Sequence, residues 1–186
     1  MKDLKEFNIP FVVLKQGNHI FEYEIENKFF EYFDFDEFHS SKIKVNLNFT
    51  KKSSLFELHF EASGTVNLDC DISLETFDLE INGTFDLIVK FGHEFNDDNE
   101  EILIIPQEAH QINTSQFIYE LVILSLPSKK IHPKVLDGTM KSKALEKLKE
   151  LEVSNKNPVE SKEEIDPRWD KLKGLTTEKN IENGTS

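Results

Sequence analysis

The stretch I-K-V-N-L-N-F, residues 43–49, alternates apolar and polar side chains without interruption. Because successive side chains of a β-strand point to opposite faces, its four apolar side chains would share one face. Lys44, Asn46 and Asn48 would then point to the other face. This pattern is typical of an antiparallel sheet with one face packed on a core and one face in water. The stretch therefore predicts a β-sheet at the centre of the fold.

Neighbouring segments extend this sheet in both directions. Two later stretches alternate in the same way, L-F-E-L-H-F-E-A-S-G-T-V-N-L-D-C at 55–70 and F-D-L-E-I-N-G-T-F-D-L-I-V-K-F at 77–91. Within the second, Asn82-Gly83 predicts either a hairpin turn or a bulge. Residues 4–13 and 19–26 flank the turn signal Gly17-Asn18 and predict a hairpin. Between that hairpin and residue 43 we expect one short helical turn that packs Phe29, Phe30 and Phe33.

The second half of the chain predicts an acidic loop and two helices. The loop is N-D-D-N-E-E at 96–101. Residues 114–126 begin at a capping residue, Asn113 or Thr114, and end before Pro127. They are apolar almost all round, so we expect this helix to be buried against the sheet. Residues 141–152 predict a charged helix with a narrow leucine stripe.

These elements together predict an α+β protein. It has a curved antiparallel sheet, with barrel-like closure as an alternative, one buried helix, one charged helix and a flexible C-terminal tail. We expect a single β-rich domain over residues 1–152. Residues 153–186 are rich in Asn, Lys, Glu and Ser and predict a largely disordered tail.

The charge of the chain favours a basic partner. The 186 residues carry a net charge of −13, and this field would repel nucleic-acid phosphates. No apolar run approaches the roughly 18 residues that a membrane span needs, and no secretory signal is evident. The single cysteine, Cys70, fits a reducing compartment. We therefore expect a cytoplasmic protein that engages neither a membrane nor a small-molecule substrate.

The sequence gives no support for catalysis, a metal or another cofactor. Cys70 lies between Asp69 and Asp71, whose charges would raise the pKa of a nucleophilic thiol. The six histidines lack the spacing of metal ligands, and the chain has no phosphate-binding glycine loop or nucleophile elbow. We therefore expect a protein that is not an enzyme, with a structural Cys70.

The segment E-I-D-P-R-W-D-K-L-K-G-L, residues 164–175, contains the only Trp and the only Arg. Asp166 suits a helix N-cap and Pro167 the first helical position, so we expect a short docking helix at 166–174. A helix of this length is unstable alone in water. It must therefore dock either on its own sheet or on a partner, through Ile165, Arg168, Trp169, Leu172 and Leu175.

Three motifs together resemble the YceD family, described as large ribosomal RNA subunit accumulation proteins. They are G-T-V-N-L-D-C-D-I-S-L-E-T-F, I-N-T-S-Q-F-I-Y-E-L-V-I-L-S-L-P-S-K-K-I-H and D-P-R-W-D-K-L-K-G-L, and the likeness spans roughly residues 60–175. The resemblance also implies a Cys-rich metal set in many relatives. Here Ser73 stands where those relatives have a second Cys, and only Cys70 and His132 remain. We therefore expect no metal.

The resemblance implies a role in large-subunit ribosomal RNA accumulation and in assembly of the large ribosomal subunit. With the charge argument, it predicts a non-catalytic factor that binds a basic ribosomal protein or a large-subunit assembly factor. The alternative is direct contact with large-subunit ribosomal RNA or its precursor. That contact would use the basic cluster around the charged helix, Lys129, Lys130, Lys141, Lys143, Lys147 and Lys149.

Overall fold

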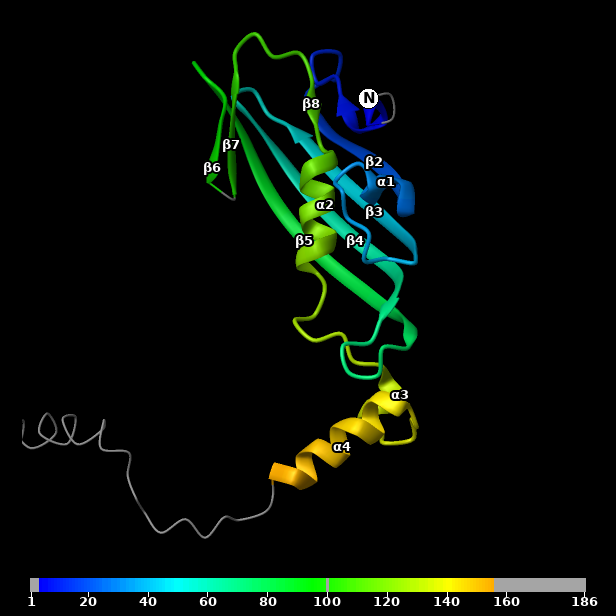
Figure 1. The fold of residues 1–186 in the computed structure, drawn as a ribbon. Helices are drawn as coiled ribbons and strands as arrows, with labels where there is room; N and C mark the ends of the chain where they lie inside the picture. The colour runs from blue at the N-terminus through cyan, green and yellow to red at the C-terminus, as the bar shows by residue number, and fades with distance from the viewer. Residues whose placement is uncertain (1–3, 100, 156–186) are drawn as a thin grey trace, which may run out of the picture. The chain divides into compact units, whose positions relative to one another are not determined.

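The computed structural model describes residues 4–99 and 101–155. Its centre is a six-stranded sheet with the strand order β2-β3-β4-β5-β7-β6 (Figure 1). The strands are β2 (Gly17–Ile25), β3 (Ser40–Lys51), β4 (Leu55–Asp69), β5 (Thr76–Gly92), β6 (Asn96–Asn99) and β7 (Ile102–Pro106). The predicted α+β class is confirmed. The sheet is not closed into a barrel, and it is mixed, because β5 and β7 pair in parallel while its other pairs are antiparallel.

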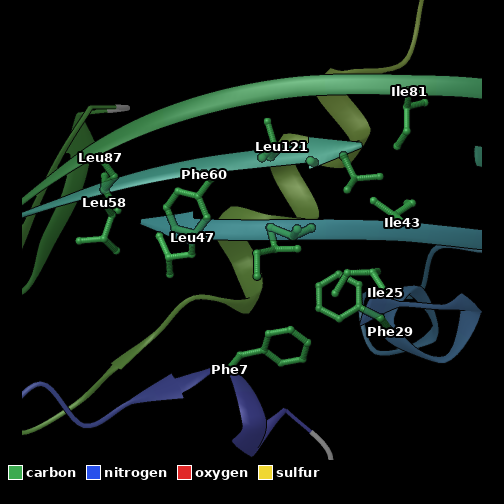
Figure 2. Packing of buried hydrophobic residues seen from close by; sticks show 14 of the residues in the cluster. Phe7, Ile25, Phe29, Ile43, Leu47, Leu58, Phe60, Ile81, Leu87 and Leu121 are labelled. Carbon is green, nitrogen blue, oxygen red and sulfur yellow. The ribbon is translucent and has the colours of Figure 1, made fainter. Parts of the chain in front are cut away.

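The predicted alternation decides which face of the sheet is buried. Leu47 lies opposite Phe60 in the register of β3 and β4, and Phe60 lies opposite Phe85 in β5. Figure 2 shows Leu47, Leu58 and Leu87, from three neighbouring strands, among the packed core side chains. From β2 through β5 the register has no bulge, so core-facing and solvent-facing positions alternate in step along the whole length of these strands.

Asn82 and Gly83 form neither a turn nor a bulge, so that prediction is wrong. β5 runs through both residues, and they pair with Ser63 and Ala62 of β4. The glycine serves helix packing instead. A Cβ atom at Gly83 would lie 2.0 Å from the Ser125 hydroxyl oxygen, next to the helix that covers this part of the sheet.

That helix is α2 (Ser115–Leu124), within the predicted range 114–126, and it packs on β4 and β5 (Figure 1). Ile118, Leu121 and Val122 are buried, whereas Leu124 is 83% exposed. At its N-terminus, the Asn113 side-chain oxygen accepts a hydrogen bond from the Ser115 backbone N–H, at 3.0 Å. The helix is therefore buried along one side, although its sequence is apolar almost all round.

The predicted N-terminal hairpin is wrong. Residues near the start form a short 3-10 helix, η1 (Lys5–Phe7), and a two-residue strand, β1 (Asn8–Ile9). β1 pairs with β8 (Ile112–Asn113), next to α2, whereas β2 pairs with β3. Pro10 directly follows β1 and has no N–H to donate, which fits so short a strand. The predicted helical turn is confirmed as α1 (Asn27–Glu31), with Phe29 and Phe30 buried.

The predicted acidic loop at 96–101 is wrong in part, because Asn96–Asn99 form the edge strand β6. Further along the chain, α3 (Pro133–Leu136) is a short helix that the sequence did not predict. The charged helix is confirmed as α4 (Lys143–Asn155). The chain divides into two compact units between Ala144 and Leu145. The predicted domain limit at residue 152 stays a prediction, and the tail that we expected to be flexible falls outside the described residues from 156 onward.

Candidate functional site

The solvated face of β2 to β5, which we call the polar sheet face, carries an excess of carboxylates. Three lysines lie on it: Lys42, Lys44 and Lys90. Eight carboxylates share it: Glu22, Glu24, Glu57, Glu61, Asp69, Asp78, Glu80 and Asp86. The unbroken register places them on one surface, because their positions alternate with the buried core positions.

A histidine joins two of these carboxylates. Asp86 Oδ1 lies 2.5 Å from His59 Nδ1, and Glu61 Oε1 lies 3.3 Å from His59 Nε2. The hydrogen bond to Asp86 is the largest cause that raises the pKa of His59 above 6.5, and Glu61 adds to it against a smaller effect of desolvation. When His59 is protonated, it offsets part of the negative charge of the face.

The carboxylates of the polar sheet face differ in whether they form ion pairs. Asp69 contacts His39, and Glu57 contacts Lys52. By contrast, Glu22, Glu24 and Glu80 form no ion pair within the described part of the chain. All three are exposed. Their charges remain available to a cationic partner, and they oppose binding of a phosphate backbone.

The opposite face of the sheet carries a cavity beside α2, which we call the α2 groove. Its volume is about 840 Å³, and β5, β7 and α2 contribute most of its apolar wall, including Phe85, Leu103, Phe117 and Leu121. Two large apolar side chains at the groove are open to solvent, Leu124 with 83% and Phe95 with 58% of its surface exposed. The groove is therefore an apolar surface that the described residues leave uncovered.

Acidic side chains also line the α2 groove. Asp97 and Glu120 are both exposed at its margin. Gln116 Nε2 donates a hydrogen bond to Glu120 Oε1 at 2.9 Å and so restrains that carboxylate. Among the described residues that line the groove, none is a lysine, an arginine or a histidine. An occupant would therefore meet apolar walls and negative charge together.

Cys70 is fully buried, yet its electrostatics differ from the prediction. Burial raises the pKa of the thiol, but the backbone N–H of His132 and hydrogen bonds from Ser73 and Ile72 outweigh it, and the pKa is lowered. The His132 N–H donates to Sγ at 3.3 Å. The Asp71 carboxylate accepts a hydrogen bond from the Lys130 backbone N–H at 2.6 Å. Across the described residues, no group of three or more His, Cys, Asp or Glu side chains could hold a metal ion.

The family model described as "Large ribosomal RNA subunit accumulation protein YceD" matches residues 58–176. The chain belongs to the YceD family. The match covers well over half of the sequence, so the predicted family is confirmed, and with it a role in large-subunit ribosomal RNA accumulation. No curated protein matches the chain. No solved structure matches it either.

The YceD match runs from β4 through α2 and the helices after it. It therefore includes most of β4, the Cys70 turn, all of β5 and most of the α2 groove. The carboxylates Glu22 and Glu24 of β2 lie before the match. The polar sheet face of this YceD-family chain is thus built jointly by matched and unmatched strands.

The lysines predicted to contact RNA are divided between the two units. Lys129, Lys130, Lys141 and Lys143 precede the division, and Lys147 and Lys149 follow it on α4. Lys130 is already engaged, since its ammonium contacts the Glu37 carboxylate and its backbone N–H donates to Asp71. The other five lysines are exposed. RNA contact by this set stays a prediction.

The predicted docking helix of the YceD-family chain, at 166–174, lies outside the described residues, with all five of its predicted contact residues. Its docking surface stays a prediction. In the described part, our reading of the sequence identified neither the polar sheet face nor the α2 groove as a site. The outward carboxylates were visible in the alternation itself. The groove was not, because it depends on how α2 sits against β5 and β7.

No helix formed by the described residues combines the length and the apolar character that crossing a membrane would require.

Proposed function

We propose that this YceD-family protein supports large-subunit ribosomal RNA accumulation by binding a basic ribosomal protein or a large-subunit assembly factor, without catalysing a reaction. The observation that carries the proposal is the excess of carboxylates on the polar sheet face, with Glu22, Glu24 and Glu80 free of ion pairs within the described residues.

Electrostatics favour a protein partner over naked RNA. A protein that grips RNA neutralises phosphates with clustered Lys and Arg side chains. The polar sheet face has the opposite sign, so it attracts those same cationic clusters on a ribosomal protein before RNA covers them. Such binding would protect a basic protein from non-specific contacts. It would also be reversible, because rRNA offers a much denser array of negative charge.

Release of the basic protein from the polar sheet face to rRNA would link this binding to rRNA accumulation. Large-subunit RNA persists when its proteins reach it in a form that can assemble, and an acidic carrier would maintain that supply. Within the described residues, Cys70 is buried, and no group of three or more His, Cys, Asp or Glu side chains could hold a metal ion. We therefore place the function in binding.

The proposal is tested by titrating the labelled full chain with two probes, RNA-free large-subunit ribosomal proteins and purified large-subunit rRNA. At about 150 mM salt, where the Debye length is about 8 Å, we expect binding to the protein fraction and little binding to rRNA. The variant Glu22→Gln/Glu24→Gln/Glu80→Gln should weaken that binding.

The matched control is Glu6→Gln/Glu31→Gln/Glu108→Gln, which removes three exposed carboxylates from outside the polar sheet face. It should bind as the unmodified chain does. Tight binding to rRNA alone, lost on Lys→Glu changes at Lys129, Lys141 and Lys143, would replace the proposal with the direct RNA contact.

A further inference from the structure

We infer that the α2 groove binds apolar side chains of a cationic amphipathic segment of the basic partner. This inference rests on the proposed function and adds a second contact to it. The polar sheet face would attract the partner through charge, and the groove would hold one of its segments through apolar contacts.

The α2 groove is large enough and apolar enough to hold several side chains of a partner. About 840 Å³ is space for several large side chains, and pockets of this size hold ligands in many proteins. Phe85, Phe117 and Leu121 form a wall that water solvates poorly. Leu124 and Phe95 extend that wall to the surface, where a monomer gains nothing by exposing them. An apolar occupant would remove this surface from water.

The charges around the groove identify the kind of occupant. Asp97 and Glu120 are at its margin, and no described lining residue is cationic. An anionic or purely apolar segment would supply no cation to either carboxylate. A segment with apolar side chains on one side and lysines or arginines beside them satisfies both features. This is the mode in which an amphipathic helix enters a groove.

The two surfaces lie on opposite faces of the sheet. Phe85, Leu87 and Leu103 of the groove occupy core-facing positions of β5 and β7, whereas Glu80 and Asp86 alternate with them on the solvated side of β5. One short peptide therefore occupies either the groove or the polar sheet face. This separation makes the two contacts independent in a binding experiment.

The test uses synthetic peptides of about fifteen residues, the length at which an isolated helix becomes marginally stable. One peptide carries leucines on one helical side and lysines on the other. In the second, serine replaces every leucine. We expect the leucine peptide to bind the full chain at least about tenfold more tightly, because burying one leucine accounts for such a factor.

Two variants separate the surfaces. Leu124→Glu should remove the additional affinity of the leucine peptide and leave serine-peptide binding unchanged. Glu22→Gln/Glu24→Gln/Glu80→Gln should weaken the serine peptide and leave the groove contact. The matched control is Leu136→Glu on α3, which makes the same change at a leucine that is 73% exposed and outside the groove. It should preserve the difference between the peptides.

Other results would overturn the inference. Equal binding of both peptides would mean that the groove is not used, while the proposed function would still stand. Failure of the serine peptide to bind, with the leucine peptide sensitive to Leu124→Glu, would contradict the proposed function alone.

The last two outcomes concern other occupants of the groove. If Trp169→Ala strengthens binding of the leucine peptide, the chain's own segment 165–175 is the competing occupant. If sedimentation shows a dimer that Leu124→Glu dissociates, the occupant is a second copy. Either result would contradict a groove that is kept for a partner.

Discussion

His59 on β4 and Asp86 on β5 are direct neighbours in the sheet register, and His59 Nδ1 lies 2.5 Å from Asp86 Oδ1. Glu61 approaches the other ring nitrogen, and Asn48 lies opposite His59 on β3. One titratable ring therefore sits between two carboxylates on the polar sheet face. Its protonation state couples the stability of the fold to the charge that the face presents.

We predict that this pair makes stability depend on pH. The fold raises the pKa of His59 above 6.5, mainly through Asp86, so the folded state favours the protonated ring. Its stabilising contribution is complete below pH 6.5 and is lost as the pH rises through the raised value. An NMR titration of the imidazole should give a pKa above 6.5. Asp86→Asn should lower that pKa, and an unchanged value would show that Asp86 is not the cause.

The same titration should affect partner binding. Deprotonation of His59 removes a positive charge from among the carboxylates. Affinity for a lysine-rich probe should therefore rise as the pH increases through the pKa of His59. His59→Gln should remove this part of the pH dependence. If the variant and the unmodified chain keep the same pH profile, His59 does not control the charge of the face.

A second prediction concerns the contact between β5 and α2. A Cβ atom at Gly83 would lie 2.0 Å from Ser125 Oγ, so Gly83→Ala should lower the free energy of unfolding by about 2 kcal/mol. The double variant Gly83→Ala/Ser125→Ala should recover much of this loss, because the closest atom is then gone. Urea unfolding would measure both.

Gly64 provides the contrast for that experiment. A Cβ atom there would lie 2.3 Å from the Lys42 carbonyl oxygen and 2.6 Å from the Ile43 Cα, which are backbone atoms. Gly64→Ala should therefore destabilise the protein at least as much, and Ser125→Ala should not restore it. Rescue of both glycine variants by Ser125→Ala would contradict this account of the packing.

A third prediction tests the core. Phe60 is fully buried, and its ring centroid lies 6.0 Å from that of Phe85 and 6.4 Å from that of Phe117 on α2. Phe60→Ala should reduce the free energy of unfolding by about 3–5 kcal/mol. Phe95→Ala, at a side chain that is 58% exposed, should change it far less. Equal losses in denaturant unfolding would mean that the core is centred elsewhere.

A fourth prediction concerns Cys70. Its lowered pKa favours the reactive thiolate, but the side chain is fully buried. We expect a thiol reagent such as Ellman's reagent to label native protein slowly and unfolded protein quickly. The labelling rate across a urea titration should follow the unfolded fraction. Rapid labelling of the native chain would show that the turn around Cys70 opens to solvent.

The sequence predicted those parts of the fold that depend on local pattern. Alternation around Leu47 and Phe60 identified the core face correctly, because strand periodicity and burial coincide there. The N-terminal pairing failed because β1 pairs with β8, more than a hundred residues away, and no local pattern encodes such a partner. The prediction of a turn or bulge at Asn82-Gly83 failed for a similar reason, because the small residue is required there by packing against Ser125, which directly follows α2.

Of the two candidate surfaces, one depends on local sequence pattern and the other on tertiary packing. The polar sheet face could have been predicted from the sequence, because the alternation of polar and apolar residues places Glu22, Glu61 and Glu80 on the solvated side of their strands. The α2 groove depends on the placement of α2 beside β7, and that placement is tertiary. Exposure of Leu124 also could not be predicted, because the apolar sequence of its helix indicated burial on nearly every side.

The most direct test of the central claim is capture from cell lysate by the tagged full chain, with and without ribonuclease, followed by mass spectrometry. The account predicts that basic large-subunit proteins or assembly factors stay bound after ribonuclease treatment. They should be depleted with Glu22→Gln/Glu24→Gln/Glu80→Gln and retained with Glu6→Gln/Glu31→Gln/Glu108→Gln. Loss of all captured ribosomal proteins upon ribonuclease treatment would contradict the claim, because RNA would then be the bound component.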